Sequence, residues 1–551
     1  GHLKLLGHID LSRTEIRALP DTICNLRNLQ ILKLLGCLWL WELPKDLCNL
    51  KNLQYLELDD IFWYKCSALP PRIGGITNLH NLHAFHVRQE SGYGMKELQF
   101  MKNLEGILHI SNLENSDDAT SAELKEKENI SGLVLEWSNK DADQQERIVQ
   151  ERVLEHLEPH HGLQKLQINH FRGNQFSSWM GILHNLKEVS LNHCINCRLL
   201  SLGPLPHLRV LRIKGMLELE QWPETMYESL IRLSISNCPL LATLPGNFPS
   251  LKVAKIKKCD ALTAFPMMPS LTFLRLIDNA MLKDFDEAWV HRHGVVSIIR
   301  GFFKYPLKLQ IINCPRLEEL PQVFAPQKLE ISGCSSLRTL PHPHDSQLLQ
   351  CLELDKCIGP SMIEAIPSTS SLYSLVISNL RYMYSLPQFP HLPGLKALYI
   401  NSCQDLVSLS YPDGLLEHLP SLKLLSISGC RKLLTFTVKD LPTSIEWLSI
   451  KDCSELRSFH PRNCLASLTS LKDLYLEDCP KLLLLPEDGL PANLQHLSIR
   501  GCPLLTQKCS EHTSGKYWPM IRHIADLEID FLQTPEPQVS ATPKKRLLLL
   551  L

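Results

Sequence analysis

The chain has 551 residues, of which 57 are Lys or Arg and 58 are Asp or Glu, so its formal net charge is -1. This balance excludes the strongly basic composition of many nucleic-acid-binding proteins. Hydrophobic residues make up 44% of the sequence, and the longest apolar run, Leu547 to Leu551, is too short to cross a bilayer. We therefore expect a folded protein with no nucleic-acid partner and no transmembrane segment.

One pattern, LxxLxLxxCxxLxxLP, recurs along most of the chain. A clear copy consists of Leu29, Leu32, Leu34, Cys37, Leu40, Leu43 and Pro44. The copies begin near residues 6, 29, 53, 79, 104, 130, 163, 186, 208, 230, 251, 271, 306, 326, 349, 372, 395, 422, 445, 471, 494 and 524. Most steps are 20 to 27 residues long, which is the period of leucine-rich repeats.

The LxL core of each copy predicts a short strand, because side chains alternate along a strand and the two leucines share its buried face. The later leucines fill the core from the opposite wall, and the proline stops regular structure there. No repeat can bury its own leucines, so the repeats must stack. The predicted fold is an α/β leucine-rich-repeat solenoid, a curved horseshoe with one long parallel concave sheet and a convex side of loops and short turns.

Departures from this rhythm divide the chain into four parts. We predict N-terminal repeats over 1–104, irregular repeats with two helical insertions over 105–160, further repeats over 161–530, and a disordered tail over 531–551.

Both insertions have helical signals. Residues 116–129 carry Asp117 and Asp118 first and Lys125 and Lys127 later, as the helix dipole favours. Residues 141–159 place Val149, Val153 and Leu157 on one face and end at Pro159.

The cysteines follow the repeat. Twelve of the 19 occupy its ninth position: Cys37, Cys194, Cys238, Cys259, Cys314, Cys334, Cys357, Cys403, Cys430, Cys453, Cys479 and Cys502. A small side chain with a weak donor suits the point where the chain turns off the strand. We interpret these residues as a structural ladder of buried free thiols, which favours a reducing compartment and a cytoplasmic location.

The sequence contains few candidate metal-binding motifs and no catalytic signature that would indicate an enzyme. Cys194 and Cys197 form a CxxC without a second pair at zinc-finger spacing. His291 and His293 lie near acidic residues in the long repeat at 283–306, but the pair has no spaced partner and is common surface composition. The sequence contains no nucleotide-binding, protease, hydrolase or kinase signature. We predict neither catalysis nor a metal or cofactor site in this chain.

Four segments resemble a known family. They are LEGILHISNLENSDDATSAELKEKENISGLVLEWS, VLEHLEPHHGLQKLQINHFRGNQFSSWM, CINCRLLSLGPLPHLRVLRIKGM and GKYWPMIRHIADLEIDFL. They are similar to blocks in the leucine-rich-repeat region of plant intracellular coiled-coil nucleotide-binding immune receptors. The resemblance implies a sensor of a pathogen effector, or of a host protein altered by one, that also holds a nucleotide switch inactive.

The chain begins at Gly1 without an initiator methionine or a signal-peptide pattern, which indicates a fragment. The coiled coil and nucleotide-binding domain of such receptors would precede Gly1, so any nucleotide would be bound there. An uncapped end around Leu6, Ile9 and Leu11 leads us to expect self-association of the isolated chain.

Two other classes share the fold. A cell-surface repeat receptor would usually carry many glycosylation sequons, whereas this chain has only Asn129-Ile130-Ser131. A substrate adaptor of F-box type in a ubiquitin ligase would also be cytosolic and rich in cysteine. A P-loop, an F-box or a signal peptide upstream of Gly1 would distinguish the three classes.

The outward positions beside the LxL cores are the candidate protein-binding surface. We expect nine cations to merge into one basic stripe that faces an acidic partner or the missing nucleotide-binding domain: Arg209, Arg212, Lys214, Arg232, Lys252, Lys255, Lys257, Lys258 and Arg275. Such cations can also be an ordinary solvated face.

Nearer the C-terminus, Tyr399, Trp447 and Tyr475 are expected at equivalent outward positions, accompanied by Asp452, Asp473, Glu477 and Asp478. Exposed aromatic residues are enriched where protein partners bind, so we predict a specificity contact there.

Overall fold

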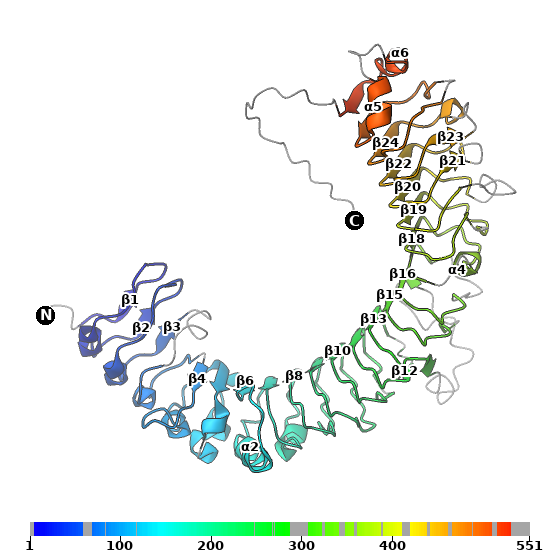
Figure 1. Ribbon diagram of the computed structural model, residues 1–551. Helices are drawn as coiled ribbons and strands as arrows, with labels where there is room; N and C mark the ends of the chain where they lie inside the picture. Colours follow the sequence, from blue (N-terminus) through cyan, green and yellow to red (C-terminus); the bar gives the residue numbers. More distant parts are fainter. Residues whose placement is uncertain are drawn as a thin grey trace. The chain divides into compact units, whose positions relative to one another are not determined.

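The computed structural model describes residues 5–58, 69–82, 84–116, 118–246, 248–266, 268, 270–286, 307–321, 326–340, 348–357, 361–386, 389–409, 419–437, 441–460, 465–486, 489–509 and 515–530. The chain divides into two compact units, Gly1–Asp345 and Ser346–Leu551. Figure 1 traces the elements along the sequence. The four-part division expected from the repeat rhythm stays a prediction.

The first unit is built on short parallel strands, one for each repeat. These are β1 (His8–Asp10), β2 (Ile31–Lys33), β3 (Tyr55–Glu57), β4 (Ala84–His86), β5 (Gly106–Ser111), β6 (Ile130–Glu136), β7 (Lys165–Asn169), β8 (Glu188–Asn192), β9 (Val210–Lys214), β10 (Arg232–Ser236), β11 (Val253–Lys257), β13 (Phe273–Ile277), β15 (Leu307–Ile312) and β16 (Pro326–Ser332). Within the described residues, β1 to β3 form a separate sheet, and β4 to β16 pair in chain order in a longer one. The side strands β12 (Ala264–Pro266) and β14 (Asp284–Asp286) pair with each other.

The second unit repeats this construction. Its main sheet contains β17 (Cys351–Asp355), β18 (Ser374–Ser378), β19 (Ala397–Asn401), β20 (Leu424–Ser428), β22 (Trp447–Lys451), β24 (Asp473–Glu477), β25 (His496–Arg500) and β26 (Asp526–Ile529), paired in that order. The side strands β21 (Thr435–Thr437) and β23 (Ser458–His460) pair with each other. All of these pairings are parallel, and the predicted α/β leucine-rich-repeat solenoid is confirmed.

Burial alternates along each strand as the LxL pattern predicts. In β10, Leu233 and Ile235 are buried, while Arg232, Ser234 and Ser236 face outward. Residues 1, 3 and 5 of such a strand therefore lie on one solvent-facing surface, which we call the strand face. Each outward residue has an outward neighbour on the next strand, because the register between these strands pairs like positions.

The cysteine ladder follows from a left-handed residue at the end of each strand. The residue before the cysteine has positive φ in many repeats, for example Asn237 (56°), Lys258 (53°) and Asp452 (51°). This conformation turns the chain so that the next side chain enters the core. All twelve ladder cysteines are buried, and every cysteine in the described residues is free. In most rungs the thiol donates to the carbonyl oxygen two residues earlier, at 3.6 Å from Cys238 to Ser236.

One rung of the ladder is an asparagine. Asn279 is fully buried between the rungs of Cys259 and Cys314. Its Oδ1 accepts a hydrogen bond from the backbone N–H of Cys259 at 3.1 Å, and its Nδ2 donates to the carbonyl of Ile256 at 3.3 Å. The side-chain amide thus forms hydrogen bonds with backbone groups to which a thiol would bond only weakly.

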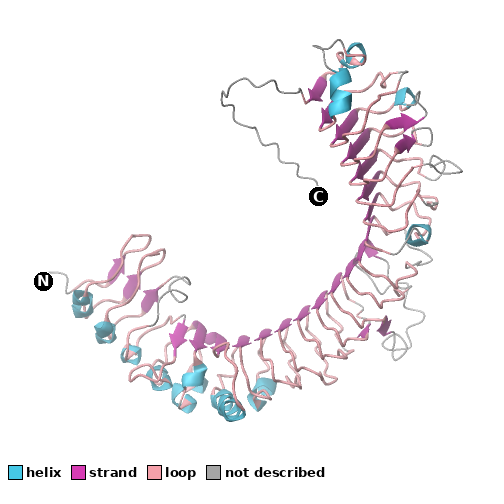
Figure 2. Ribbon diagram, in the orientation of Figure 1, coloured by secondary structure: helices cyan, strands magenta, loops and turns pink. Residues whose placement is uncertain are grey.

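The helices are mostly single turns. The first unit contains the 3-10 helices η1 (Asp21–Asn25), η2 (Lys45–Asn49), η3 (Ile73–Gly75), η4 (Met95–Leu98), η5 (Leu113–Asn115), η6 (Ala119–Ala122), η7 (Leu124–Glu126) and η8 (Ser178–Ile182) and the α-helix α2 (Gln144–His156). In this unit they lie on the side of the repeats opposite the strands (Figure 2). The second unit contains α4 (Ser361–Glu364), η12 (Leu465–Ser467), α5 (Pro503–Cys509) and α6 (Trp518–Ile521).

The first insertion contains helical turns, but they differ from a continuous helix along the dipole pattern. Residues 116–129 form the two short helices η6 and η7 rather than one α-helix, because Glu123 between them is left-handed, with φ 45° and ψ 49°. Lys127 does not serve the helix dipole on the surface; it is fully buried. Asp117 lies outside the described residues, and Asp118 caps η6 by accepting from the N–H of Thr120.

The second insertion is the predicted helix, α2, which begins with a capping box between Asp143 and Glu146. Its buried stripe differs from the prediction. Val153 and Leu157 are buried, but Val149 is 37% exposed. Gln150 is buried instead, where its Oε1 accepts from the N–H of Arg172. The helix ends at His156, before the predicted end at Pro159.

Candidate protein-recognition surface

The sheet register brings part of the predicted basic stripe together. In one row across β9 to β13, Arg212 pairs with Ser234, Ser234 with Lys255, and Lys255 with Arg275. In the next row, Lys214 and Lys257 are separated by Ser236. Two cationic rows therefore run side by side, each interrupted by a serine of β10.

The other predicted cations border these rows. Arg232 opens β10 in a row with Val210 and Val253. Arg209 and Lys252 precede their strands and are linked through the backbone of Ile231. Lys258 occupies the left-handed position after β11. The predicted stripe is thus a broad patch over β9 to β13, which we call the basic patch.

Few carboxylates neutralise the basic patch. Arg212 forms an ion pair with Glu188, and Arg275 donates from Nε to Gln310 at 2.5 Å. Arg275 and Lys255 also approach the ring of Phe273, at 5.8 and 5.9 Å from its centroid. Six further cations form no ion pair with any residue that the structure describes: Arg209, Lys214, Arg232, Lys252, Lys257 and Lys258. The patch consequently presents excess positive charge to solvent.

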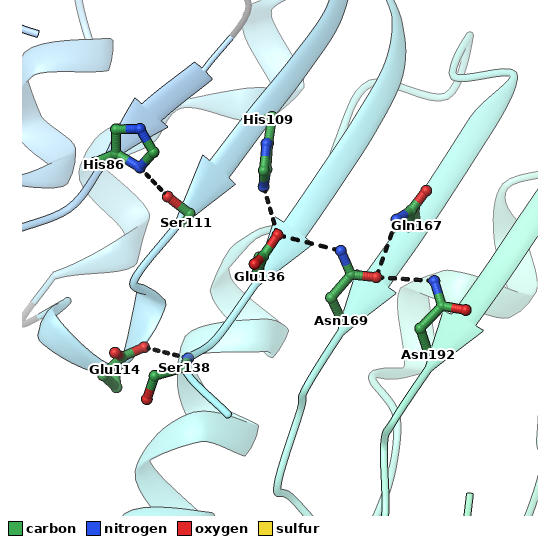
Figure 3. Close-up of polar contacts among 9 residues, drawn as sticks. All are labelled: His86, His109, Ser111, Glu114, Glu136, Ser138, Gln167, Asn169 and Asn192. Carbon is green, nitrogen blue, oxygen red and sulfur yellow. Dashed lines mark hydrogen bonds and ion pairs between the residues drawn. The ribbon is translucent and has the colours of Figure 1, made fainter. Parts of the chain in front are cut away.

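A polar ladder that the sequence interpretation missed precedes the basic patch on the strand face (Figure 3). Nε2 of His109 donates to Oε2 of Glu136 at 2.8 Å, and Nδ2 of Asn169 donates to the same oxygen at 3.3 Å. Nδ2 of Asn192 then donates to Oδ1 of Asn169 at 2.9 Å. The hydrogen bond from His109 lowers the pKa of the Glu136 carboxyl below its ordinary value. The register continues from Asn192 to Lys214, so the ladder leads into the basic patch.

Figure 3 also shows how neighbouring repeats are joined near this ladder. His86 on β4 contacts the hydroxyl of Ser111 on β5, and burial lowers the pKa of the His86 imidazole. Glu114 accepts from the N–H of Ser138 at 3.0 Å. Aligning the last strand residue of successive repeats would have revealed the ladder in the sequence, since Glu136, Asn169 and Asn192 each end their strands and are register neighbours.

The predicted aromatic residues do not all meet. The rings of Trp447 and Tyr475 are 5.3 Å apart between centroids, whereas Tyr399 lies three strands from Tyr475, with Ser426 and Ser449 between them in the register. Tyr399 and Tyr475 are the third residues of their strands, but Trp447 is the first residue of β22. The prediction of equivalent positions is therefore wrong for Trp447.

A histidine, and not Tyr399, is the third ring beside Trp447 and Tyr475. The ring of His496, on β25, lies 4.8 Å from that of Tyr475. We call Trp447, Tyr475 and His496 the aromatic cluster. Of the predicted acidic companions, Asp473 and Glu477 lie on β24, while Asp452 and Asp478 occupy left-handed positions after β22 and β24.

The metal candidates add no site. No group of three or more potential metal ligands occurs among the residues described by the structure. Burial raises the pKa of Cys194 to about 12 and that of Cys197 well above its usual range. His291 and His293 lie outside the described residues. No described helix is long and apolar enough to cross a membrane.

The fold defines a leucine-rich-repeat protein, with polar and basic residues on the strand face of the first unit and the aromatic cluster on that of the second. Residues 95–216 match the family of R13L1/DRL21 leucine-rich repeats. A putative disease resistance protein of Arabidopsis thaliana is 37% identical over 230 residues, which are 38% of this chain and 16% of that protein. Disease resistance protein RGA2 of Solanum bulbocastanum is 31% identical over 276 residues, which are 46% of this chain and 27% of RGA2.

The resemblance to the leucine-rich-repeat region of plant disease-resistance receptors is thereby confirmed, and the chain spans less than a third of the length of these two relatives. Among solved structures, YopM from Yersinia enterocolitica WA-314 is 18% identical with a TM-score of 0.46, covering 90% of this chain and 88% of YopM. The structure of a TLR13-ssRNA13 complex gives 15% identity and a TM-score of 0.40, covering 96% of this chain and 92% of that one.

Proposed function

We propose that this chain is the protein-recognition region of a plant disease-resistance receptor. It binds a pathogen effector, or a host protein modified by one, and restrains the nucleotide switch of the receptor. The relatives named as disease resistance proteins support this role. The ladder of free thiols favours action in the cytoplasm, where thiols stay reduced.

The observation that carries the binding mode is the excess charge of the basic patch. Unpaired cations on neighbouring strands create a field that attracts an acidic protein surface and speeds its association. The partner is therefore an acidic region of an effector or host protein, or an acidic surface of the nucleotide-binding domain of the same receptor. Nucleotide, where such a domain is present, is bound there and not by this chain.

The receptor role is tested in the plant. Disruption of the gene should abolish resistance to at least one pathogen isolate that the intact plant resists, and restoring the gene should recover it. Unchanged resistance across a broad panel of isolates would contradict the proposal.

The binding mode is tested with an oligoglutamate peptide as a minimal acidic probe. Replacing both Lys255 and Lys257 by Glu should slow association, and the difference should shrink as salt is added. The matched control replaces Lys45 and Lys51, two exposed lysines in or next to η2, by Glu and causes the same change in net charge. Equal effects of the two double variants would show that overall charge, not the basic patch, governs binding.

A further inference from the structure

The aromatic cluster offers a different surface from the basic patch. Trp447, Tyr475 and His496 come from the consecutive strands β22, β24 and β25, and each is partly exposed. The rings of Trp447 and Tyr475 are inclined by 52°, and those of Tyr475 and His496 by 38°. The three rings thus form a continuous aromatic surface across three repeats.

Carboxylates surround this aromatic surface. Asp473 is the register neighbour of Trp447 on one side and of His496 on the other. Asp526 follows His496 in the same row, and its Oδ2 lies 2.8 Å from Nδ1 of His496. The next row places Glu528 beyond Tyr475 and Ser498. The cluster is therefore bordered by acidic side chains from β24 and β26.

These carboxylates outnumber the cations on the same strands. The outward positions of β22, β24, β25 and β26 carry Asp473, Glu477, Asp526 and Glu528, against Lys451 and Arg500. Lys451 is paired with Glu477 at 2.9 Å, and Arg500 with Glu528 at 2.7 Å. Asp473 has no ion pair within the part of the chain that the structure describes. The carboxylate without an ion pair thus belongs to the register neighbour of Trp447.

Aromatic faces and a neighbouring free carboxylate together fit a cation. The negative face of an indole or phenol ring attracts a cation, most strongly for tryptophan. A guanidinium fits better than an ammonium, because it is planar, stacks on rings and can form two parallel hydrogen bonds to one carboxylate. Arginine is also the charged residue most enriched at protein interfaces.

We propose that the aromatic cluster binds an arginine side chain of a protein partner, with the guanidinium on the rings of Trp447 and Tyr475 and paired with Asp473. This deepens the proposed function, because it requires that the strand face recognises proteins. The two surfaces have opposite charge preferences: the basic patch takes an acidic region, and the aromatic cluster takes a basic one.

The probe is an acetylated and amidated Gly-Arg-Gly-Arg-Gly peptide, titrated into the whole chain by calorimetry. Three matched peptides carry lysine, neutral citrulline or glutamate in place of arginine. Binding should be strongest for the arginine peptide, weaker for the lysine peptide, and lost for the citrulline and glutamate peptides. Binding of the citrulline peptide as strong as that of the arginine peptide would overturn the proposal, as would no binding of the arginine peptide.

Variants locate the site. Trp447→Ala should lower the affinity for the arginine peptide about tenfold. Asp473→Asn should also lower this affinity and make it depend less on salt. Trp447→Phe, which keeps an aromatic face, should retain most of the affinity. Tyr399→Ala is the matched control, because Tyr399 is an outward aromatic residue of the same sheet, three strands from Tyr475. An equal loss in Tyr399→Ala and Trp447→Ala would exclude the cluster as the site.

This experiment is independent of the basic patch. If the oligoglutamate peptide fails to bind while the arginine peptide binds at the cluster, only the proposed binding mode of the basic patch is wrong. If the arginine peptide fails while oligoglutamate binds through Lys255 and Lys257, the arginine site is wrong and the recognition function stands.

Discussion

The side-chain amine of Lys127 donates a hydrogen bond of 2.7 Å to the carbonyl oxygen of Leu98, so a fully buried lysine ties one repeat to the repeat before it. A second bond, of 3.2 Å, reaches the carbonyl of Met101. Leu98 is the last residue of η4, and Met101 lies three residues beyond it, so both acceptors are at the C-terminal end of this short helix, where carbonyl groups lack helical partners. The lysine thus gives the carbonyl of Leu98 a second donor beside the N–H of Met101, and it pairs the carbonyl of Met101 as well.

The first prediction concerns the pH dependence caused by Lys127. Burial lowers the pKa of its amine to about 8, below the ordinary value of 10.5. Between these two values the unfolded chain holds the proton and the folded chain does not, so stability should rise as the pH increases through this window. Lys127→Met should lose this rise, measured by urea denaturation at the two ends of the window. Lys125→Met, at a lysine whose side chain is 60% exposed, is the control and should behave like the parent.

The second prediction concerns acid stability and Glu136. Because the hydrogen bond from His109 lowers the pKa of this carboxyl, the contribution of Glu136 to stability is present above the ordinary value of 4.5 and is lost as the pH falls through the lower folded value. Glu136→Gln should therefore be less stable than the parent at neutral pH, and the difference should shrink in acid. Thermal melting of the parent and the variant at neutral and at acid pH measures this difference in stability. A difference that stays constant between the two pH values would contradict the stabilising role of the Glu136 carboxylate.

The third prediction concerns thiol reactivity. Burial raises the pKa of Cys238 to about 11 and those of Cys259 and Cys357 to about 12, so these thiols should alkylate slowly in the native protein and rapidly after unfolding. Cys351, on the strand face and only half-buried, is the internal control and should react before these three thiols. Mass spectrometry after timed alkylation gives the order, and equal rates for Cys351 and the ladder thiols would refute the prediction.

A substitution tests the same ladder through stability. Cys453 is fully buried, and its thiol donates to the carbonyl of Lys451 at 3.4 Å. Cys453→Ser keeps a hydrogen-bond donor of similar size and should lower the free energy of unfolding by about 1 kcal/mol. Cys453→Arg should cost about 4 kcal/mol or more, because it buries an unpaired charge. Chemical denaturation compares the two; similar midpoints would mean that the site is not enclosed.

The fourth prediction concerns close packing between repeats at Gly74. A Cβ atom at this position would lie 2.2 Å from the carbonyl oxygen of Glu97, which belongs to η4 of the next repeat. Gly74→Ala should therefore destabilise the first unit by about 2 kcal/mol, since the obstacle is backbone. Gly94→Ala is the control, because nothing lies within 4 Å of its added Cβ. A loss of stability of the same size in both variants would contradict this account.

Much of the fold could be read from the sequence. The spacing of Leu233, Ile235 and Cys238 fixed which side chains are buried, because alternation along a strand is a local property. The helix α2 was predicted from apolar residues at helical spacing, of which Val153 and Leu157 are buried, because this spacing is also a local property. The resemblance to disease-resistance receptors was likewise carried by continuous segments of sequence.

The candidate surfaces were only partly predictable. The nine cations of the basic patch were identified from their repeat positions, but their arrangement in two rows depends on the register between strands. Trp447 was assigned the wrong strand position, and His496 was missed because it comes from the next repeat. Their roles in binding remain predictions.

What the sequence alone determined is the order within each repeat: which residues form the strand, which leucines and cysteines enter the core, and where outward positions fall. Only the tertiary structure decided which outward residues meet, that Asn279 replaces a thiol, and that Lys127 is buried rather than solvated. The reason is physical. Burial of an apolar side chain follows from the local period, whereas burial of a polar one requires partners that stacking brings from a neighbouring repeat.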